Sequence, residues 1–171
     1  MRRVTTAMSV MAVLLWATAA YAQKPNFSGK WAVNAEKTAA ANPNAMAGGG
    51  GGGGGRGGGR GGGGSFEIKQ DATTLTRTAI MQDGSARAAT VYKLDGTESK
   101  NMQAGRGGGD PVEVISVAKW VGNTIEIVTK GANGDTKAVW SMDGADLKIA
   151  TTTPPRQGGE AMTRTTIYSK G

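Results

Sequence analysis

The stretch VEVISVAKWVGNTIEIVTK, residues 112–130, decides the fold class of this chain. It consists of two runs rich in β-branched residues, separated by Gly122-Asn123. β-Branched and aromatic residues favour strands, and a glycine-containing pair between two such runs supplies the backbone conformation of a tight hairpin turn. We therefore expect two antiparallel strands, over 112–121 and 124–130.

The first of these strands carries apolar residues on both faces. Val114 and Trp120 lie on one face, and Ile115 and Val117 lie on the other. A strand with one solvated face alternates between apolar and polar residues instead. Two interpretations stay open: the strand is covered on both sides, or it lines a cavity.

The pattern of a strand-like run followed by a turn continues in both directions. Successive turn glycines are 12 residues apart from Gly122 to Gly134 and 10 apart from Gly134 to Gly144. This is the spacing of consecutive antiparallel strands, and it leaves no room for crossover helices. Further strands are expected over 66–70, 73–81, 89–94, 137–142, 147–152 and 163–169 and around Trp31.

The chain is thus predicted to be all-β, with an antiparallel meander of eight or nine strands. Closure of such a meander into an up-and-down barrel removes its exposed edges. The only helix expected is a turn or two around Asn34–Ala41.

Length and composition limit the possible classes of protein. The 171 residues suffice for one ordinary domain. The chain has no Cys and no His, and its formal net charge is +7. Ser-His-Asp or thiolate catalysis, zinc or haem ligation by His, and disulfide bonds are therefore excluded. We expect no metal site and no cofactor.

The first residues have the three parts of a secretory signal. Met1-Arg2-Arg3 is a basic start, residues 7–16 are mostly apolar, and Ala20-Tyr21-Ala22 is a small-x-small cleavage site. A membrane anchor is the alternative, but a spanning helix needs roughly 20 predominantly apolar residues. We expect cleavage after residues 1–22, a secreted or periplasmic location, no integral membrane span after cleavage, and a single β-barrel domain over 23–171.

A glycine-rich segment interrupts the expected meander. Residues 48–64 hold 15 Gly together with Arg56 and Arg60, and a shorter segment at 105–109 contains Arg106. Such a composition has little to bury and much backbone entropy to lose, so we expect a flexible loop at about 38–64. Nucleic-acid binding is not expected, because the arginines are few and no aromatic residue lies between them. Weak contact of the three arginines with an acidic polysaccharide or another polyanion is the alternative to a plain surface loop.

A short motif opens the expected domain. Phe27-Ser28-Gly29-Lys30-Trp31 contains the Gly-x-Trp sequence that precedes an antiparallel meander, and it resembles the opening motif of lipocalins and related calycin barrels. The chain is still more similar to a group of small secreted bacterial proteins that open with Phe-Ser-Gly-x-Trp. It departs from lipocalins in lacking the disulfide that many of them have, a clear Thr-Asp-Tyr motif and a long C-terminal helix.

The resemblance implies a role for the motif tryptophan. In lipocalins it closes one end of the barrel, and a basic residue of the last strand packs across it. Trp31 would take this position here, with Arg164 or Lys170 as the basic residue in a cation–π contact.

Aromatic residues on the expected strands are the candidate ligand contacts. Trp120, Trp140, Tyr92 and Tyr168 can form a stacking platform for a small ligand, or they can be core residues and cross-strand partners.

Paired carboxylates are the only enzymatic route that the composition leaves open. Glu67, Glu113 and Glu126 each lie between apolar neighbours on an expected strand. Strand alternation therefore points them to solvent, and we assign no catalytic residue.

Three hypotheses follow for function. The first is a secreted, non-enzymatic, lipocalin-like β-barrel that binds a small apolar or amphipathic ligand. The alternative is an envelope or extracellular interaction protein with a filled barrel, whose basic loop contacts acidic polymer or a protein partner. A carboxylate hydrolase is the third.

Overall fold

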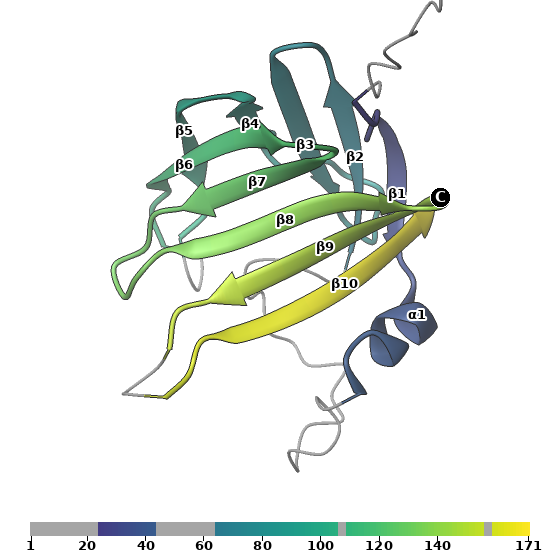
Figure 1. Cartoon of the computed structure of the whole chain (residues 1–171). Coiled ribbons are helices and arrows are strands. Elements are labelled where there is room, and N and C mark those ends of the chain that lie inside the picture. The colour runs from purple at the N-terminus through teal and green to yellow at the C-terminus, as the bar shows by residue number, and fades with distance from the viewer. Residues whose placement is uncertain (1–23, 44–63, 106–108, 156–158) are drawn as a thin grey trace, which may run out of the picture.

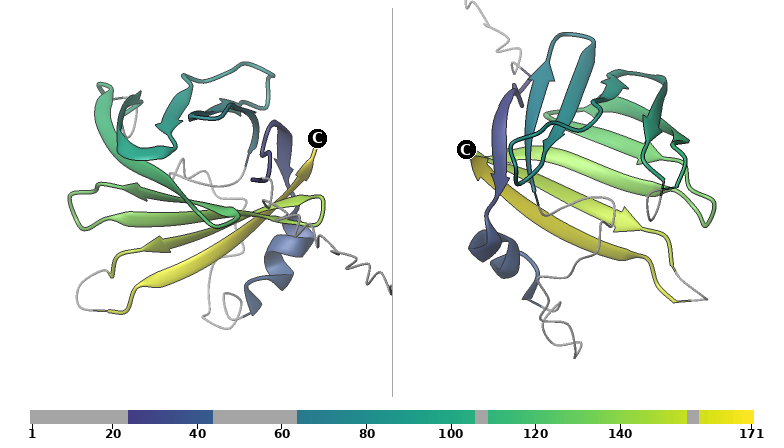
Figure 2. Two further views of the ribbon diagram at one scale, coloured as in Figure 1. Left: turned by 45° about the horizontal axis from the view of Figure 1, so that its top comes forward. Right: turned by 180° about the vertical axis from the view of Figure 1, so that it is seen from behind.

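The computed structural model describes residues 24–43, 64–105, 109–155 and 159–171, and these form ten strands and one helix (Figure 1). In chain order the elements are β1 (Gly29–Val33), α1 (Ala35–Ala40), β2 (Ser65–Gln70), β3 (Thr74–Ile80), β4 (Thr90–Lys93), β5 (Asp95–Gln103), β6 (Val112–Val121), β7 (Thr124–Thr129), β8 (Thr136–Asp143), β9 (Asp146–Thr153) and β10 (Met162–Lys170). The predicted fold class is confirmed: the protein is an all-β antiparallel meander that forms a nearly closed barrel (Figure 2).

Pairing between the first and the last strand joins the two halves of the sheet. The hydrogen-bonded order is β4-β3-β2-β1-β10-β9-β8-β7-β6-β5. Trp31 on β1 lies opposite Phe66 of β2 on one side and opposite Lys170 of β10 on the other. β4 and β5 follow each other in the chain but stand at the two ends of this order, so the ladder of backbone hydrogen bonds is interrupted between them.

The sequence pattern missed β5. No strand was expected between 89–94 and 112–121, but in the structure β5 begins at Asp95, directly after the expected strand over 89–94. The register of β5 against β6 shifts between Asp95 and Glu98, and Gly96 has a φ of +85°. Because of this irregularity, the chain can turn after β4 while the first residues of β5 already pair with β6. The barrel therefore has ten strands in the described residues, rather than eight or nine.

The burial of β6 decides between the two interpretations of the apolar faces of residues 112–121. Val114 and Ala118 are buried, whereas Ile115 and Val117 on the opposite face are half-exposed. The strand therefore lines the interior of the barrel with one face and is not covered on both sides.

The expected helix is present as α1, and it packs on the outer face of β10 (Figure 1). Asn34 caps it, because its side-chain oxygen accepts a hydrogen bond from the Lys37 N–H at 3.0 Å. The Ile167 N–H donates to Thr38 Oγ1 at 2.9 Å, and the Thr165 N–H donates to Asn42 Oδ1 at 2.9 Å. The expected flexible loop therefore does not begin at about residue 38. Beyond the end of β1, the side chains of residues 38 and 42 accept hydrogen bonds from backbone N–H groups of β10, which would otherwise be an open strand edge.

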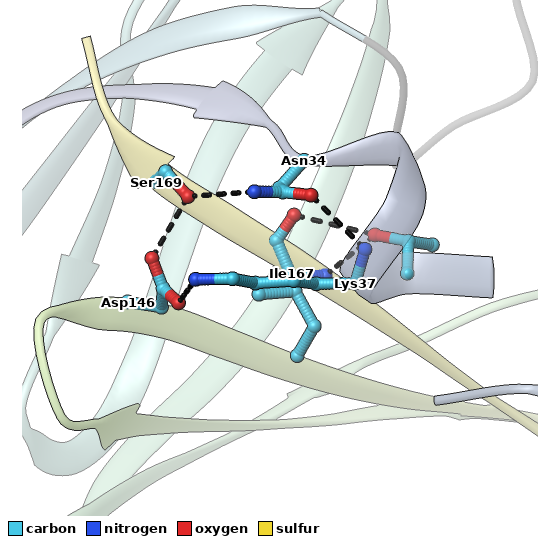
Figure 3. A network of polar contacts seen from close by, with 6 residues as sticks. Asn34, Lys37, Asp146, Ile167 and Ser169 are labelled. Carbon is cyan, nitrogen blue, oxygen red and sulfur yellow. Dashed lines mark hydrogen bonds and ion pairs between the residues drawn. The ribbon is translucent and has the colours of Figure 1, made fainter. Parts of the chain in front are cut away.

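A polar network ties α1 to the last two strands (Figure 3). Asp146 accepts hydrogen bonds from Lys37 Nζ at 2.5 Å and from Ser169 Oγ at 2.8 Å. The Asn34 side-chain amide donates to Ser169 Oγ at 3.1 Å. The same asparagine thus caps the helix and fixes it to the barrel wall.

Several predictions concern residues outside the described ranges. They are the signal sequence and its cleavage site, most of the glycine-rich loop with Arg56 and Arg60, and Arg106 in the second glycine segment. Within the described ranges, no helix combines the length and the apolar character needed to span a membrane.

Candidate ligand-binding site

An aromatic layer crosses the interior of the barrel. It is made of Phe66, Tyr92, Trp140 and Tyr168, which are all buried and come from β2, β4, β8 and β10. The Phe66 ring centroid lies 4.8 Å from that of Tyr168 and 6.4 Å from that of Trp140. The Tyr92 and Trp140 centroids are 6.3 Å apart. Of the four aromatic residues expected to be ligand contacts or core residues, the structure thus brings together three, Tyr92, Trp140 and Tyr168.

One end of the barrel is filled and sealed, and we call it the closed end. Phe27 and Trp31 are fully buried there, and Trp31 Nε1 donates to the Phe27 carbonyl oxygen at 2.8 Å. The Phe27 ring stacks on Trp120 with centroids 5.9 Å apart, and Lys24 Nζ lies 5.0 Å from the Trp120 ring centroid. The structure therefore places Trp120 at the closed end with Phe27 and Lys24, rather than in the aromatic layer.

Of the two basic residues expected on Trp31, the structure selects Lys170. Its Nζ lies 5.7 Å from the Trp31 ring centroid. Arg164 is exposed and lies opposite Thr151, near the other end of β10. Arg164 does not pack on Trp31, because β1 reaches only the last residues of β10, from Tyr168 to Lys170.

Beyond the aromatic layer, away from the closed end, the inner face combines short side chains with the buried Val114 and Ile127. Alternation from the buried residues of β6 to β10 places five residues on this part of the inner face, which we call the polar half: Ser116, Thr129, Ala138, Thr151 and Thr166. Ser116 is buried, and its hydroxyl is hydrogen-bonded to that of Thr129 at 3.0 Å. The other four residues are half-exposed.

Sequence reasoning missed Arg77, a basic residue inside the barrel. Leu75 is fully buried, so alternation places Arg77 on the same inner face of β3. The guanidinium carbon lies 4.4 Å from the Phe66 ring centroid, which is a cation–π distance. Burial raises the pKa values of Tyr92 and Tyr168, and the nearby Arg77 charge opposes both shifts. The alternation of Leu75 and Arg77 was the signal in the sequence that could have found it.

Side chains close the barrel between β4 and β5. The Val91 N–H donates to Asn101 Oδ1 at 2.8 Å, and Asn101 Nδ2 donates to the Val91 carbonyl at 2.9 Å. The Lys93 N–H donates to Ser99 Oγ at 2.8 Å. The backbone groups of β4 are thus hydrogen-bonded to the buried side chains of Asn101 and Ser99 instead of to the backbone of a neighbouring strand. We call this contact between the two strands the β4–β5 seam.

The strand glutamates face outward. Glu126 forms ion pairs with Lys137 at 2.6 Å and with Lys119 at 3.9 Å, and Glu113 pairs with Lys100 at 3.5 Å. Glu67 lies between Phe66 and Ile68, two buried residues that face the interior. Across the described part of the chain, no group of three or more acidic side chains is placed to hold a metal ion.

Comparison with known proteins supports the fold. No family model and no curated protein matches the sequence. Solved structures of the same fold include a variant of the REP1-NXSQ fatty acid transporter, with 14% identity, a TM-score of 0.53 and coverage of 84% of this chain and 97% of the other. The zebrafish ileal bile acid-binding protein complexed with cholic acid has 16% identity, a TM-score of 0.53 and coverages of 85% and 98%. An abundant heat soluble (SAHS) protein from Ramazzottius varieornatus has 13% identity, a TM-score of 0.52 and coverages of 85% and 95%.

At these identities the likeness shows the fold alone. The neighbours are calycin-like barrels, so the predicted resemblance to calycin barrels is confirmed for the fold. The closer similarity to small secreted bacterial proteins stays a prediction.

Proposed function

We propose that the protein is a non-enzymatic binding protein that holds a small apolar or amphipathic molecule inside its barrel. One observation carries the proposal: the inner face changes from a packed aromatic layer to the short side chains of the polar half, four of which are half-exposed. A barrel of eight strands is only just wide enough for side chains to fill it, and the diameter grows with strand number. In a ten-stranded barrel we therefore expect short side chains to leave room for a ligand.

The composition of the interior fits an amphipathic ligand. The aromatic layer offers ring faces to an apolar body, and the hydroxyl groups of Thr129, Thr151 and Thr166 offer hydrogen bonds to polar atoms. Two neighbours of the same fold are a fatty acid transporter and a bile acid-binding protein, which supports a ligand of this class. In this proposal the protein acts outside the cytoplasm, after cleavage of the signal sequence.

An uncharged, environment-sensitive dye such as Nile red tests the proposal. We expect the purified chain to bind the dye with an increase in fluorescence. Ala138→Phe places a large ring on the inner face of β8, and it should weaken dye binding by roughly tenfold or more, because it fills the polar half.

Val139→Phe is the matched control. Val139 is the next residue of β8 and lies opposite the outward-facing Glu126. This variant should bind the dye like the parent chain. A folded parent chain that binds no dye would refute the proposal, as would an equal loss of binding in both variants.

A further inference from the structure

We propose that Asn133, in the turn between β7 and β8, is a site of spontaneous deamidation, where the chain converts its own amide into aspartate and isoaspartate. This modification site is independent of the proposed ligand pocket. Three features carry it: the glycine that follows Asn133, the exposure of the turn, and the contacts that occupy the comparable residues elsewhere in the chain.

The reaction needs no partner other than water. The backbone nitrogen of Gly134 gives its proton to solvent base and attacks the side-chain carbonyl carbon of Asn133. A C–N bond forms and closes a succinimide ring, the bond to the side-chain nitrogen breaks, and ammonia leaves with a proton taken from solvent. Water then adds to either carbonyl carbon of the ring and opens it, which gives aspartate or isoaspartate. One ammonia is lost and one water is gained, with no oxidation or reduction.

Gly134 lets the two reacting atoms approach each other. It has no side chain to shield its nitrogen, and residues 131–135 are all exposed. The Gly134 N–H donates to the Gly131 carbonyl oxygen at 3.2 Å. A single hydrogen bond in an exposed turn opens in local fluctuations. The attacking nitrogen is therefore set free without unfolding of the barrel, and the attack has the advantage of an intramolecular reaction.

The other turns of similar sequence lack the amide. Three aspartates precede glycine, in the pairs Asp83-Gly84, Asp95-Gly96 and Asp143-Gly144. A carboxylate is ionised at neutral pH, and it has no ammonia to lose. Asp83 and Asp95 also accept hydrogen bonds at 2.6–2.9 Å from the hydroxyl and the N–H of Ser85 and of Thr97, which hold the pKa of both carboxyls below its usual range. Asn133 is the only asparagine of the chain that precedes a glycine.

The other described asparagines are held or shielded. Four of them accept hydrogen bonds from backbone N–H groups with their side-chain oxygens: Asn26, Asn34, Asn42 and Asn101. Asn133 makes no such bond within the part of the chain that the structure describes. Asn123 is exposed as well, but the β-branched Thr124 follows it and crowds the nitrogen that would attack. Reactivity should therefore be concentrated at one residue.

The fold keeps the reactive pair in place. Gly134 has a φ of +105°, which residues with a Cβ rarely adopt. In isoaspartate the main chain runs through the side-chain methylene, so the backbone of the turn becomes longer by one carbon. The new carboxylate also brings a negative charge to a turn that already contains Asp135. The modification thus changes the length and the charge of the connection between β7 and β8.

Peptide mapping by mass spectrometry tests the inference. The full chain is kept folded at body temperature and mildly alkaline pH, and samples are digested in acidic buffer, which stops the reaction. We expect the Asn133 peptide to take the mass of the acid and to separate into aspartate and isoaspartate forms, roughly tenfold or more faster than the Asn123 peptide. Asn133→Gln is the matched control. It keeps the turn glycine but needs a larger ring for the same attack, so its peptide should keep its amide.

Three outcomes would overturn the inference. The first is an Asn133 peptide that keeps its amide as long as the Asn123 peptide does. The second is deamidation that occurs only in chain unfolded with urea, because the fold would then protect the pair. The third is equal conversion of the same peptide in Asn133→Gln, which would place the modification at another residue. None of these results bears on dye binding, so the proposed function is tested separately.

Discussion

Gly134, in the turn between β7 and β8, shows how closely one residue is fixed by its surroundings. Its φ is +105°, a conformation that residues with a Cβ rarely adopt. A Cβ at this position would also lie 2.9 Å from the Cβ of Pro154. Both backbone strain and a steric clash therefore oppose any other residue here.

Two glycine variants separate these effects. Gly134→Ala should lower the free energy of unfolding by about 2–4 kcal/mol, because it adds the clash to the strain. Gly84→Ala, at a φ of +82° with no atom within 4 Å of the added Cβ, should cost only about 1–2 kcal/mol. Urea unfolding of both variants measures the difference, and equal losses would contradict this account.

Two arginines show why the local sequence does not reveal the candidate site. LTRTAI at residues 75–80 and MTRTTI at residues 162–167 are nearly the same hexapeptide. Arg77 in the first has a buried Nε and lies over Phe66, whereas Arg164 in the second is exposed. The neighbouring strands decide the difference, because Arg77 lies opposite Ile68 and Arg164 lies opposite Thr151. The burial of Trp140 and Tyr92 could be predicted because large aromatic side chains bury much apolar area, and their contact with a ligand stays a prediction.

Among the elements, β5 was the one strand that the sequence concealed. Its nine residues, DGTESKNMQ, include one β-branched residue and only one large apolar residue. Ser99 and Asn101 are buried all the same, because they form the hydrogen bonds of the β4–β5 seam. Propensity predicts strands that pack apolar side chains, and it misses a strand whose buried face is polar. The other strands and α1 were predicted close to their observed places, because apolar alternation, glycine turns and the Asn34 cap all agreed.

The β4–β5 seam leads to a prediction at the scale of the two strands. Asn101→Ala leaves the N–H and the carbonyl of Val91 without their present partner. We expect the free energy of unfolding to fall by about 1–3 kcal/mol, and the Val91 amide to exchange its hydrogen markedly faster. Gln103→Ala, on the same face of β5, is the control and should leave the Val91 exchange rate unchanged. Equal protection of Val91 in the parent and in Asn101→Ala would show that the side chain does not close the seam.

For the whole molecule, stability should fall in acid. Hydrogen bonds from Lys37 and Ser169 lower the pKa of Asp146, and side-chain and backbone hydrogen bonds lower the pKa of Asp71, Asp83 and Asp95. A lowered pKa means that the folded chain binds fewer protons than the unfolded chain as the pH approaches that value. The free energy of unfolding should therefore be highest above about pH 4 and fall as the pH is lowered further.

Asp146→Asn tests this sign. The variant should be less stable than the parent chain near neutral pH, and the difference in melting temperature should shrink below about pH 4, where the parent carboxylate takes up its proton. Asp110→Asn, at an exposed position, is the control and should follow the parent curve. A difference that stays constant from neutral pH to pH 2 would exclude the Asp146 network as a source of the acid sensitivity.

The pairing of β1 with β10 has a consequence for biosynthesis. Asn34 and Ser169, which are hydrogen-bonded to each other, are 135 residues apart in the chain. Contacts between such distant segments slow folding, because a long loop must close before they form. A ribosome delivers β1 early and β10 late, so the nascent chain lacks the strand that joins the two halves of its sheet while synthesis continues. The barrel therefore completes its folding only after translation has passed β10, and until then the chain remains open to any factor that handles unfolded polypeptides.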